Sequence, residues 1–117
     1  MATHNDLGKK GEEFAKKYFE QNNYEILHCN WRHSRYEVDI IASKNNFLHF
    51  IEVKARSNNR FGHPEESVGK KKIENLMNAA EEFLHQFPQW KKIQFNILSI
   101  SIVNNKPEFF LIEDVYL

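Results

Sequence analysis

The 117-residue sequence is poor in cysteine, proline and glycine, and it carries no net charge. Its single cysteine, Cys29, excludes an internal disulfide, so we expect a reducing compartment, the cytoplasm. No apolar run approaches the roughly 20 residues of a membrane span and no signal-peptide pattern is present, so no membrane partner is expected. Because 16 Lys and Arg balance 16 Asp and Glu, any polyanion must be held by a local cluster of positive charge.

Apolar residues are plentiful by contrast. They make up 41% of the chain and include ten phenylalanines, which is enough for a packed core. A chain of this length accommodates one core but not two. We therefore predict a single domain over residues 1–117. The absence of a Gly-rich phosphate loop and of a Gly-x-Ser-x-Gly elbow leaves kinase and serine-hydrolase functions without support.

Hydrophobic spacing and turn residues predict the element order α-β-β-β-α-β-β. Helical spacing covers residues 6–22 and the segment from about residue 69 to Pro88, which forbids continuation. Strand-like segments cover residues 24–31, 36–43, 47–56, 93–103 and 109–112. Helices that interrupt a run of strands must cover the faces of one sheet. The predicted fold class is therefore α/β (α+β), with a central mixed sheet flanked by two helices.

Two glycines, Gly8 and Gly11, fall inside the first predicted helix. Each weakens a helix by roughly 1 kcal/mol relative to alanine. We expect them to permit close backbone approach to the element on which the helix packs.

Charged side chains occupy the middle of two neighbouring predicted strands. A tight turn at Asn45-Asn46 sets Asp39 opposite Glu52, and Lys54 shares a strand face with Glu52. Opposed carboxylates repel one another, and burial adds a desolvation cost, so a cation is expected between them. Mg²⁺ prefers carboxylate oxygens together with water and substrate phosphate. Asp39, Glu52 and Lys54 therefore suggest a hydrolytic metal site.

A second interpretation of this cluster stays open at this point. Glu-x-Lys occurs by chance, and an Asp-Glu-Lys group can be an ordinary surface network on an uncovered sheet face. The apolar neighbours Ile41 and Phe50 on one side of the sheet, and Ile51 and Val53 on the other, indicate instead that both faces are covered. Burial of Asp, Glu and Lys together favours a functional site.

Several motifs follow one another along the chain. They are Gly8-x-x-Gly11-Glu12, Asn30-Trp31-Arg32, Glu37-Val38-Asp39-Ile40-Ile41, Phe50-Ile51-Glu52-Val53-Lys54-Ala55-Arg56, and Phe61-Gly62-x-Pro64 with Val68. The ordered set spans nearly the whole sequence and resembles the bacterial YraN family of the PD-(D/E)XK nuclease superfamily. That resemblance implies a restriction-endonuclease-like core of order α-β-β-β-α-β and similarity to archaeal Holliday junction resolvases.

The resemblance also implies roles for individual residues. Asp39 and Glu52 would be the metal ligands for Mg²⁺ or Mn²⁺, Lys54 the catalytic lysine, and Glu12 a further acid reaching the site from the first helix. The sequence departs from the family pattern at Tyr36, where glycine is usual, and at Asn96, where aspartate is frequent.

The functional prediction is a metal-dependent endonuclease that hydrolyses phosphodiester bonds in DNA, with branched or structured DNA as the expected substrate. The alternative is a catalytically silent nuclease-fold module that binds nucleic acid or a protein partner. A third, weaker interpretation is a purely structural interaction domain. Similarity to resolvases suggests a homodimer, which would cut two symmetric strands.

Positive side chains that could contact nucleic acid flank the predicted hairpin and the second helix, whose amino end also favours a phosphate. They are Arg32, Arg35, Arg56, Arg60, Lys70, Lys71 and Lys72. A solubilising surface is the alternative for any one of them.

Overall fold

The computed structural model describes residues 4–57 and 69–115. Within these ranges the elements are α1 (His4–Gln21), β1 (Glu25–His33), β2 (Tyr36–Lys44), β3 (Phe47–Arg56), α3 (Lys70–Gln86), β4 (Ile93–Val103) and β5 (Lys106–Ile112). This confirms the predicted α+β class and the order α-β-β-β-α-β-β. The last strand begins earlier than predicted, because Asn104 and Asn105 turn the chain with φ of 53° and 64° and Val103 already pairs with Lys106.

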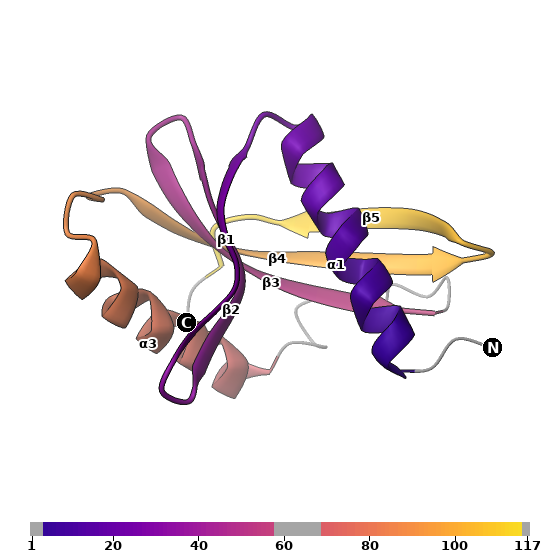
Figure 1. The fold of residues 1–117 in the computed structure, drawn as a ribbon, viewed down its shortest axis with the longest axis horizontal. Coiled ribbons are helices and arrows are strands. Elements are labelled where there is room, and N and C mark those ends of the chain that lie inside the picture. Colours follow the sequence, from indigo (N-terminus) through magenta and orange to yellow (C-terminus); the bar gives the residue numbers. More distant parts are fainter. Residues whose placement is uncertain (1–3, 58–68, 116–117) are drawn as a thin grey trace.

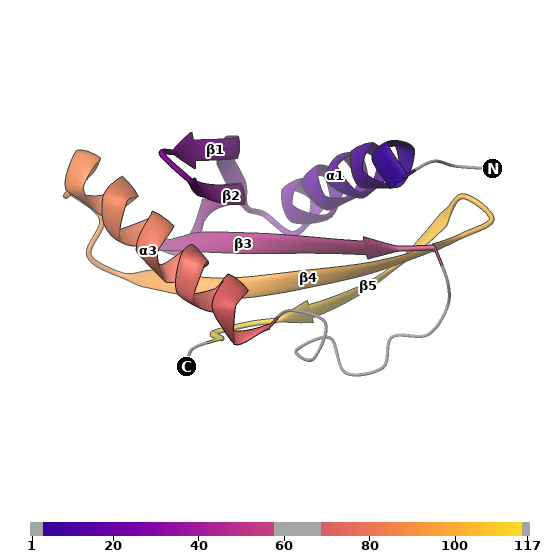
Figure 2. The ribbon, with the colours of Figure 1, turned by 90° about the horizontal axis from the view of Figure 1, so that it is seen from below.

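The strands form one sheet in the order β1-β2-β3-β4-β5. Among the described strands, β3 and β4 run parallel, and all other neighbouring pairs are antiparallel. A parallel pair requires a crossover connection, and α3 lies on that connection. The β1–β2 hairpin turns steeply away from the layer formed by β3, β4 and β5, and α1 lies beside the hairpin on the same side of that layer (Figures 1 and 2).

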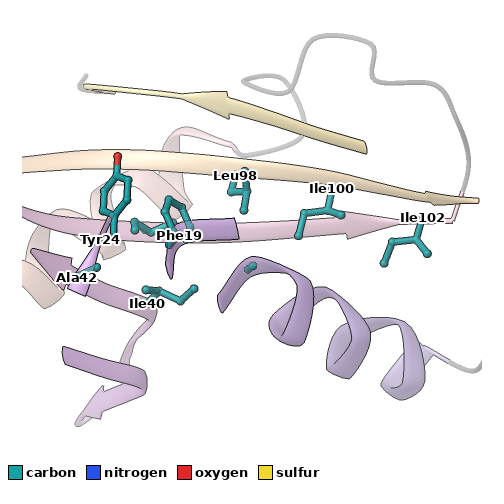
Figure 3. Packing of buried hydrophobic residues seen from close by; sticks show 9 residues of the cluster. Phe19, Tyr24, Ile40, Ala42, Leu98, Ile100 and Ile102 are labelled. Carbon is teal, nitrogen blue, oxygen red and sulfur yellow. The ribbon is translucent and has the colours of Figure 1, made fainter. Parts of the chain in front are cut away.

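Helix α1 packs on one face of the sheet. Ala15 and Phe19 are fully buried against the strands, and Ile100 and Ile102 of β4 point toward the helix (Figure 3). At Gly11 an added Cβ would lie 2.7 Å from the Cβ of Ala55 on β3, which confirms the predicted close approach. The same expectation is wrong for Gly8, where an added Cβ would meet nothing within 4 Å.

Helix α3 covers the other face, near β2 and β3. Its buried residues Leu76, Ala80 and Phe83 pack in one cluster with Ile41 and Phe50. The helix ends at Gln86, two positions before Pro88. Both faces around β3 are therefore covered, as the apolar neighbours of Glu52 predicted. Across the described ranges, no helix combines the length and the apolar character needed to cross a membrane.

Candidate active site

The candidate site forms where β2 separates from β3. Asn45 and Asn46, with φ of 53° and 68°, make the predicted two-residue turn and set the pairing of Ile41 with Phe50 and of Ile40 with Ile51. Cα pairing ends there, and Asp39 and Glu52 are the next positions in the same register. The predicted register is therefore confirmed up to the pair Ile40–Ile51, whereas Asp39 and Glu52 themselves are not paired.

Beyond the last paired residues, the Asp39 carboxylate, and not a β2 backbone carbonyl, accepts the hydrogen bond from the β3 backbone. The Val53 backbone N–H donates to Asp39 Oδ2 at 2.7 Å. On the other side of β2, Asn30 of β1 adopts a left-handed φ of 53° near the position that would face Asp39. The strand is thus irregular at Asp39, and the carboxylate is fixed to the β3 backbone at Val53, the residue after Glu52.

A cavity of about 480 Å³ opens at this divergence. All four residues predicted to be catalytic, Glu12, Asp39, Glu52 and Lys54, line it, although they come from α1, β2 and β3. The remaining lining residues are Leu7, Gly8, Arg35, Glu37, Val53, Ala55, Lys72, Asn75 and Leu76. The fold thus gathers four carboxylates and three cationic side chains around one space.

The negative charge of an ionised Asp39 is not fully compensated by its surroundings in the cavity. Burial raises the pKa of Asp39 to about 7, and repulsion from Glu52 adds to the increase. The hydrogen bond from Val53 opposes the rise, whereas Glu37 and Glu12 reinforce it. A pKa this high indicates that the ionised carboxylate lacks a sufficient counter-ion.

Glu52 differs because it has cationic neighbours. Its side chain is 18% exposed, and burial raises its pKa even though Lys72 and Lys54 act to lower it. Lys72 Nζ lies 3.5 Å from Glu52 Oε1. Two lysines therefore only partly offset the cost of burying this carboxylate.

These carboxyl groups suit a hard divalent cation. In the described part of the chain no three His, Cys, Asp or Glu side chains are grouped so that they alone could cage a metal ion. Mg²⁺ does not need such a cage, because it keeps several waters and commonly binds one or two protein carboxylates together with substrate phosphate. The raised pKa values of Asp39 and Glu52 show that burial of this carboxylate pair is not compensated by the charged side chains around it.

The positive residues predicted to bind nucleic acid separate into distinct groups. Arg35, from the turn between β1 and β2, and Lys72, from α3, line the cavity. Arg32 pairs with Glu37 at 3.6 Å on the surface, with side chains 73% and 45% exposed. Of the other basic residues in this prediction, Lys70, Lys71 and Arg56 are described but do not line the cavity. Arg60 lies outside the described residues, and so does the motif that begins at Phe61.

Asn75 was not identified from the sequence. It lines the cavity one helical turn after Lys72, and the signal available for it was this three-residue spacing on the amphipathic α3. Because Asn75 is exposed among charged residues, the helical pattern alone does not distinguish it from a residue on the solvent-facing side of α3.

The two departures from the family pattern have different surroundings. Tyr36 is half-buried next to the cavity-lining Arg35, whose guanidinium lies 5.4 Å from the centre of the Tyr36 ring. Asn96 is fully buried away from the cavity lining, where it contacts His49 Nδ1 at 3.0 Å and accepts from the Asp114 N–H at 3.1 Å. Asn96 thus holds the segment after β5 against the sheet.

Sequence comparisons place the chain among bacterial relatives of similar length. A protein of Bacteroides thetaiotaomicron described as a UPF0102 protein is 43% identical over 100 residues, covering 86% of this chain and 83% of the relative. A UPF0102 protein of Christiangramia forsetii is 43% identical over 106 residues, covering 91% and 87%. One from Flavobacterium johnsoniae is 40% identical over 117 residues, covering 97% and 93%.

The family profile described as "Uncharacterised protein family UPF0102" matches residues 11–100. This range contains Glu12, Asp39, Glu52, Lys54 and Lys72, and it ends within β4. Because the match covers most of the chain and the relatives align along nearly their full length, the chain belongs to the UPF0102 family, the YraN family that its motifs resemble.

Proposed function

We propose that this protein is a Mg²⁺- or Mn²⁺-dependent endonuclease that hydrolyses phosphodiester bonds in DNA. The observation that carries the proposal is the convergence of Asp39 and Glu52, both with raised pKa values, beside Lys54 in one cavity. Perturbed titratable groups that share a cavity are typical of catalytic sites. The shared element order with the nuclease core supports the same reaction class.

Asp39 and Glu52 would hold the divalent ion. When bound, such an ion supplies a Lewis acid and a template for phosphoryl oxygens. The Val53 N–H orients Asp39 for this task, because it engages Oδ2 and leaves the other carboxylate oxygen available. Glu52 projects from the neighbouring strand at the next register position.

Lys54 and Glu12 complete the chemistry. The Lys54 ammonium donates to a phosphoryl oxygen, where negative charge develops in the transition state. Glu12, which lines the same cavity from α1, would accept a hydrogen bond from the attacking water and so orient it.

Substrate affinity would come from local positive charge. Arg35 and Lys72 lie at the cavity and would contact phosphates that flank the cleaved bond. The chain as a whole has no net charge, so these contacts have to be made at the site. Branched DNA is the proposed substrate, and cutting its two symmetric strands would require two copies of the chain.

The test compares cleavage of end-labelled branched, forked and linear DNA in Mn²⁺ by the unmodified protein, Glu52→Gln and the control Glu81→Gln. Glu81 is exposed on α3 and does not line the cavity, so its variant should cut normally. We expect Glu52→Gln to lose at least about 100-fold in rate, the scale of one lost electrostatic group. Cleavage that survives Glu52→Gln would exclude the proposed site.

The same samples distinguish the silent-module alternative. A binding module without catalysis would bind DNA in EDTA, would take up no Mn²⁺ in calorimetry and would leave every substrate intact. The endonuclease instead requires Mn²⁺ uptake that depends on Asp39 and Glu52.

A further inference from the structure

Lys72 makes an ion pair that its predicted role as a phosphate contact does not explain. It projects from the first turn of α3 across the cavity, and its Nζ lies 3.5 Å from Oε1 of Glu52 on β3. The neighbouring Lys71 is exposed and does not line the cavity. Of the three lysines that begin α3, Lys72 is therefore the one that reaches the carboxylate pair.

The two side chains of this ion pair differ in their freedom to move. Glu52 is 18% exposed, whereas the Lys72 side chain is 54% exposed. The lysine ammonium is a point charge on a flexible stem and makes no rigid two-pronged contact, unlike arginine. Lys72 can therefore leave Glu52 without unpacking α3, which is held by Ile73 and Leu76.

A divalent ion would need the same carboxylate. The Lys72 ammonium and a dication close to Glu52 would repel each other in a partly desolvated cavity, where charge interactions are stronger than in bulk water. One of the two cations must then move away from Glu52, and the exposed lysine is free to do so.

We propose that Lys72 is a built-in placeholder cation, which neutralises Glu52 while the metal position is empty, competes with the divalent ion, and turns to a DNA phosphate once that ion is bound. This inference rests on the proposed function, because it assumes that Glu52 is a metal ligand. In this role Lys72 is a positioning residue. It makes metal binding and DNA binding mutually favourable, since the ion releases Lys72 from Glu52 to the DNA, and a bound phosphate holds Lys72 away from the metal position.

The first test measures Mn²⁺ affinity by calorimetry without DNA for the unmodified protein, Lys72→Met and the control Lys71→Met. Lys72→Met should bind Mn²⁺ about tenfold more tightly, because competition and repulsion are both removed. Lys71→Met should stay within about twofold, since screening weakens a charge outside the cavity. Lys72→Gln is a second variant, and thermal unfolding of each protein verifies that it is folded.

A double-mutant cycle then localises the effect to the ion pair. In a Glu52→Gln background, Lys72→Met should change Mn²⁺ affinity much less than in the unmodified protein, because the neutral amide no longer holds the lysine. Equal effects in both backgrounds would overturn the placeholder role. So would Mn²⁺ binding by Lys72→Met that is no tighter than that of the unmodified protein.

The third measurement follows DNA in a Lys54→Met background, which leaves both proposed ligands in place while preventing cleavage. Mg²⁺ should raise DNA affinity, and adding Lys72→Met should remove at least about threefold of that increase, whereas adding Lys71→Met should not. An unchanged increase would contradict the transfer of Lys72 to phosphate.

Failure of the proposed function would look different. In that case the unmodified protein would take up no Mn²⁺, or uptake would be indifferent to both Glu52→Gln and Asp39→Asn. Mn²⁺ uptake that is weakened by Glu52→Gln but unchanged by Lys72→Met would support the metal site and exclude only the placeholder role.

Discussion

At the scale of single residues, Asp39 joins a structural role to a chemical one. Its carboxylate accepts the Val53 N–H and at the same time lies against Glu52 with a pKa near 7. Burial favours the protonated form, whereas the hydrogen bond and a metal ion favour the ionised form. The residue thus has two protonation states available near neutral pH, and their balance can be measured.

Stability should depend on pH through Asp39. The pKa in the folded state is about 7 and in the unfolded chain about 3.9, so between these values the folded state retains a proton that the unfolded state has lost. The free energy of unfolding should therefore fall as pH rises from about 4 to about 7 and then level off. We expect Asp39→Asn, which can still accept from Val53, to reduce this fall by up to about 4 kcal/mol, since the pKa difference is about three units at about 1.4 kcal/mol each. Urea unfolding across the pH series measures the difference, and identical slopes for the two proteins would contradict it.

Metal affinity should change in the opposite direction over the same range. A cation requires the ionised carboxylate, so a metal ion bound as proposed would release the Asp39 proton below pH 7. Mn²⁺ affinity should rise about tenfold per pH unit below the pKa and become flat above it. Calorimetry in buffers of different ionisation enthalpy reports the proton release, and affinity that does not vary between pH 5 and pH 8 would argue against Asp39 as a ligand.

At the scale of elements, the contact of α1 with β3 positions Glu12. Gly11 allows the helix to approach Ala55 on the strand that carries Glu52 and Lys54. Gly8, one turn earlier, lines the cavity in open space. The two glycines of one motif therefore have different physical functions, one in packing and one at the site.

Alanine substitutions should separate those functions. Gly11→Ala places two Cβ atoms 2.7 Å apart, and this overpacking should destabilise the protein by about 1–3 kcal/mol despite the better helix propensity of alanine. Gly8→Ala meets nothing within 4 Å and should stabilise by up to about 1 kcal/mol. Thermal unfolding measures both effects. Adding Ala55→Gly should restore part of the loss in Gly11→Ala, and a failure to do so would show that the clash lies elsewhere.

The turn between β2 and β3 sets the register of the site. Asn46 adopts φ of 68°, a conformation in which glycine has no steric penalty. Asn46→Gly should stabilise by about 0.5 kcal/mol, and Asn46→Ala should destabilise by about 1 kcal/mol. Equal melting temperatures for these two variants would contradict this account of the turn.

At the scale of the whole molecule, positive and negative charges balance, and both signs also meet at the cavity. The 16 positive and 16 negative side chains cancel, yet Arg35, Lys54 and Lys72 converge on the cavity. Binding of DNA should then rest on a small number of phosphate contacts. The protein should show a weaker salt dependence than a globally basic nuclease of the same size.

Salt titrations test this arrangement. With about three phosphate contacts, raising NaCl from about 50 to about 200 mM should weaken DNA binding about 40-fold. The double variant Arg35→Gln with Lys72→Gln should reduce the slope by about two, because each contact contributes roughly 0.9. The control pair Lys70→Gln with Lys71→Gln lies outside the cavity and should leave the slope unchanged. A larger change in the control would place the DNA on the start of α3 instead.

Local patterns predicted much of the molecule. Asparagine pairs located the tight turns, and alternation placed Glu52 and Lys54 on one strand face, so the cross-strand register followed from short-range rules. Three features depend on long-range packing and were not accessible: the separation of β2 from β3 at Asp39, the reach of Lys72 to Glu52, and the entry of Asn75 into the lining. The seven positive residues formed one group in the sequence because the chain order does not show which sides of α3 and of the hairpin face the cavity.

The hydrogen bond from Val53 to Asp39 also provides a spectroscopic probe within the protein itself. An amide proton that points at a carboxylate shifts in frequency when that carboxylate gains a proton or loses electron density to a cation. The Val53 resonance in a ¹⁵N-labelled sample should therefore follow the ionisation of Asp39 directly, and no label needs to be attached near the cavity.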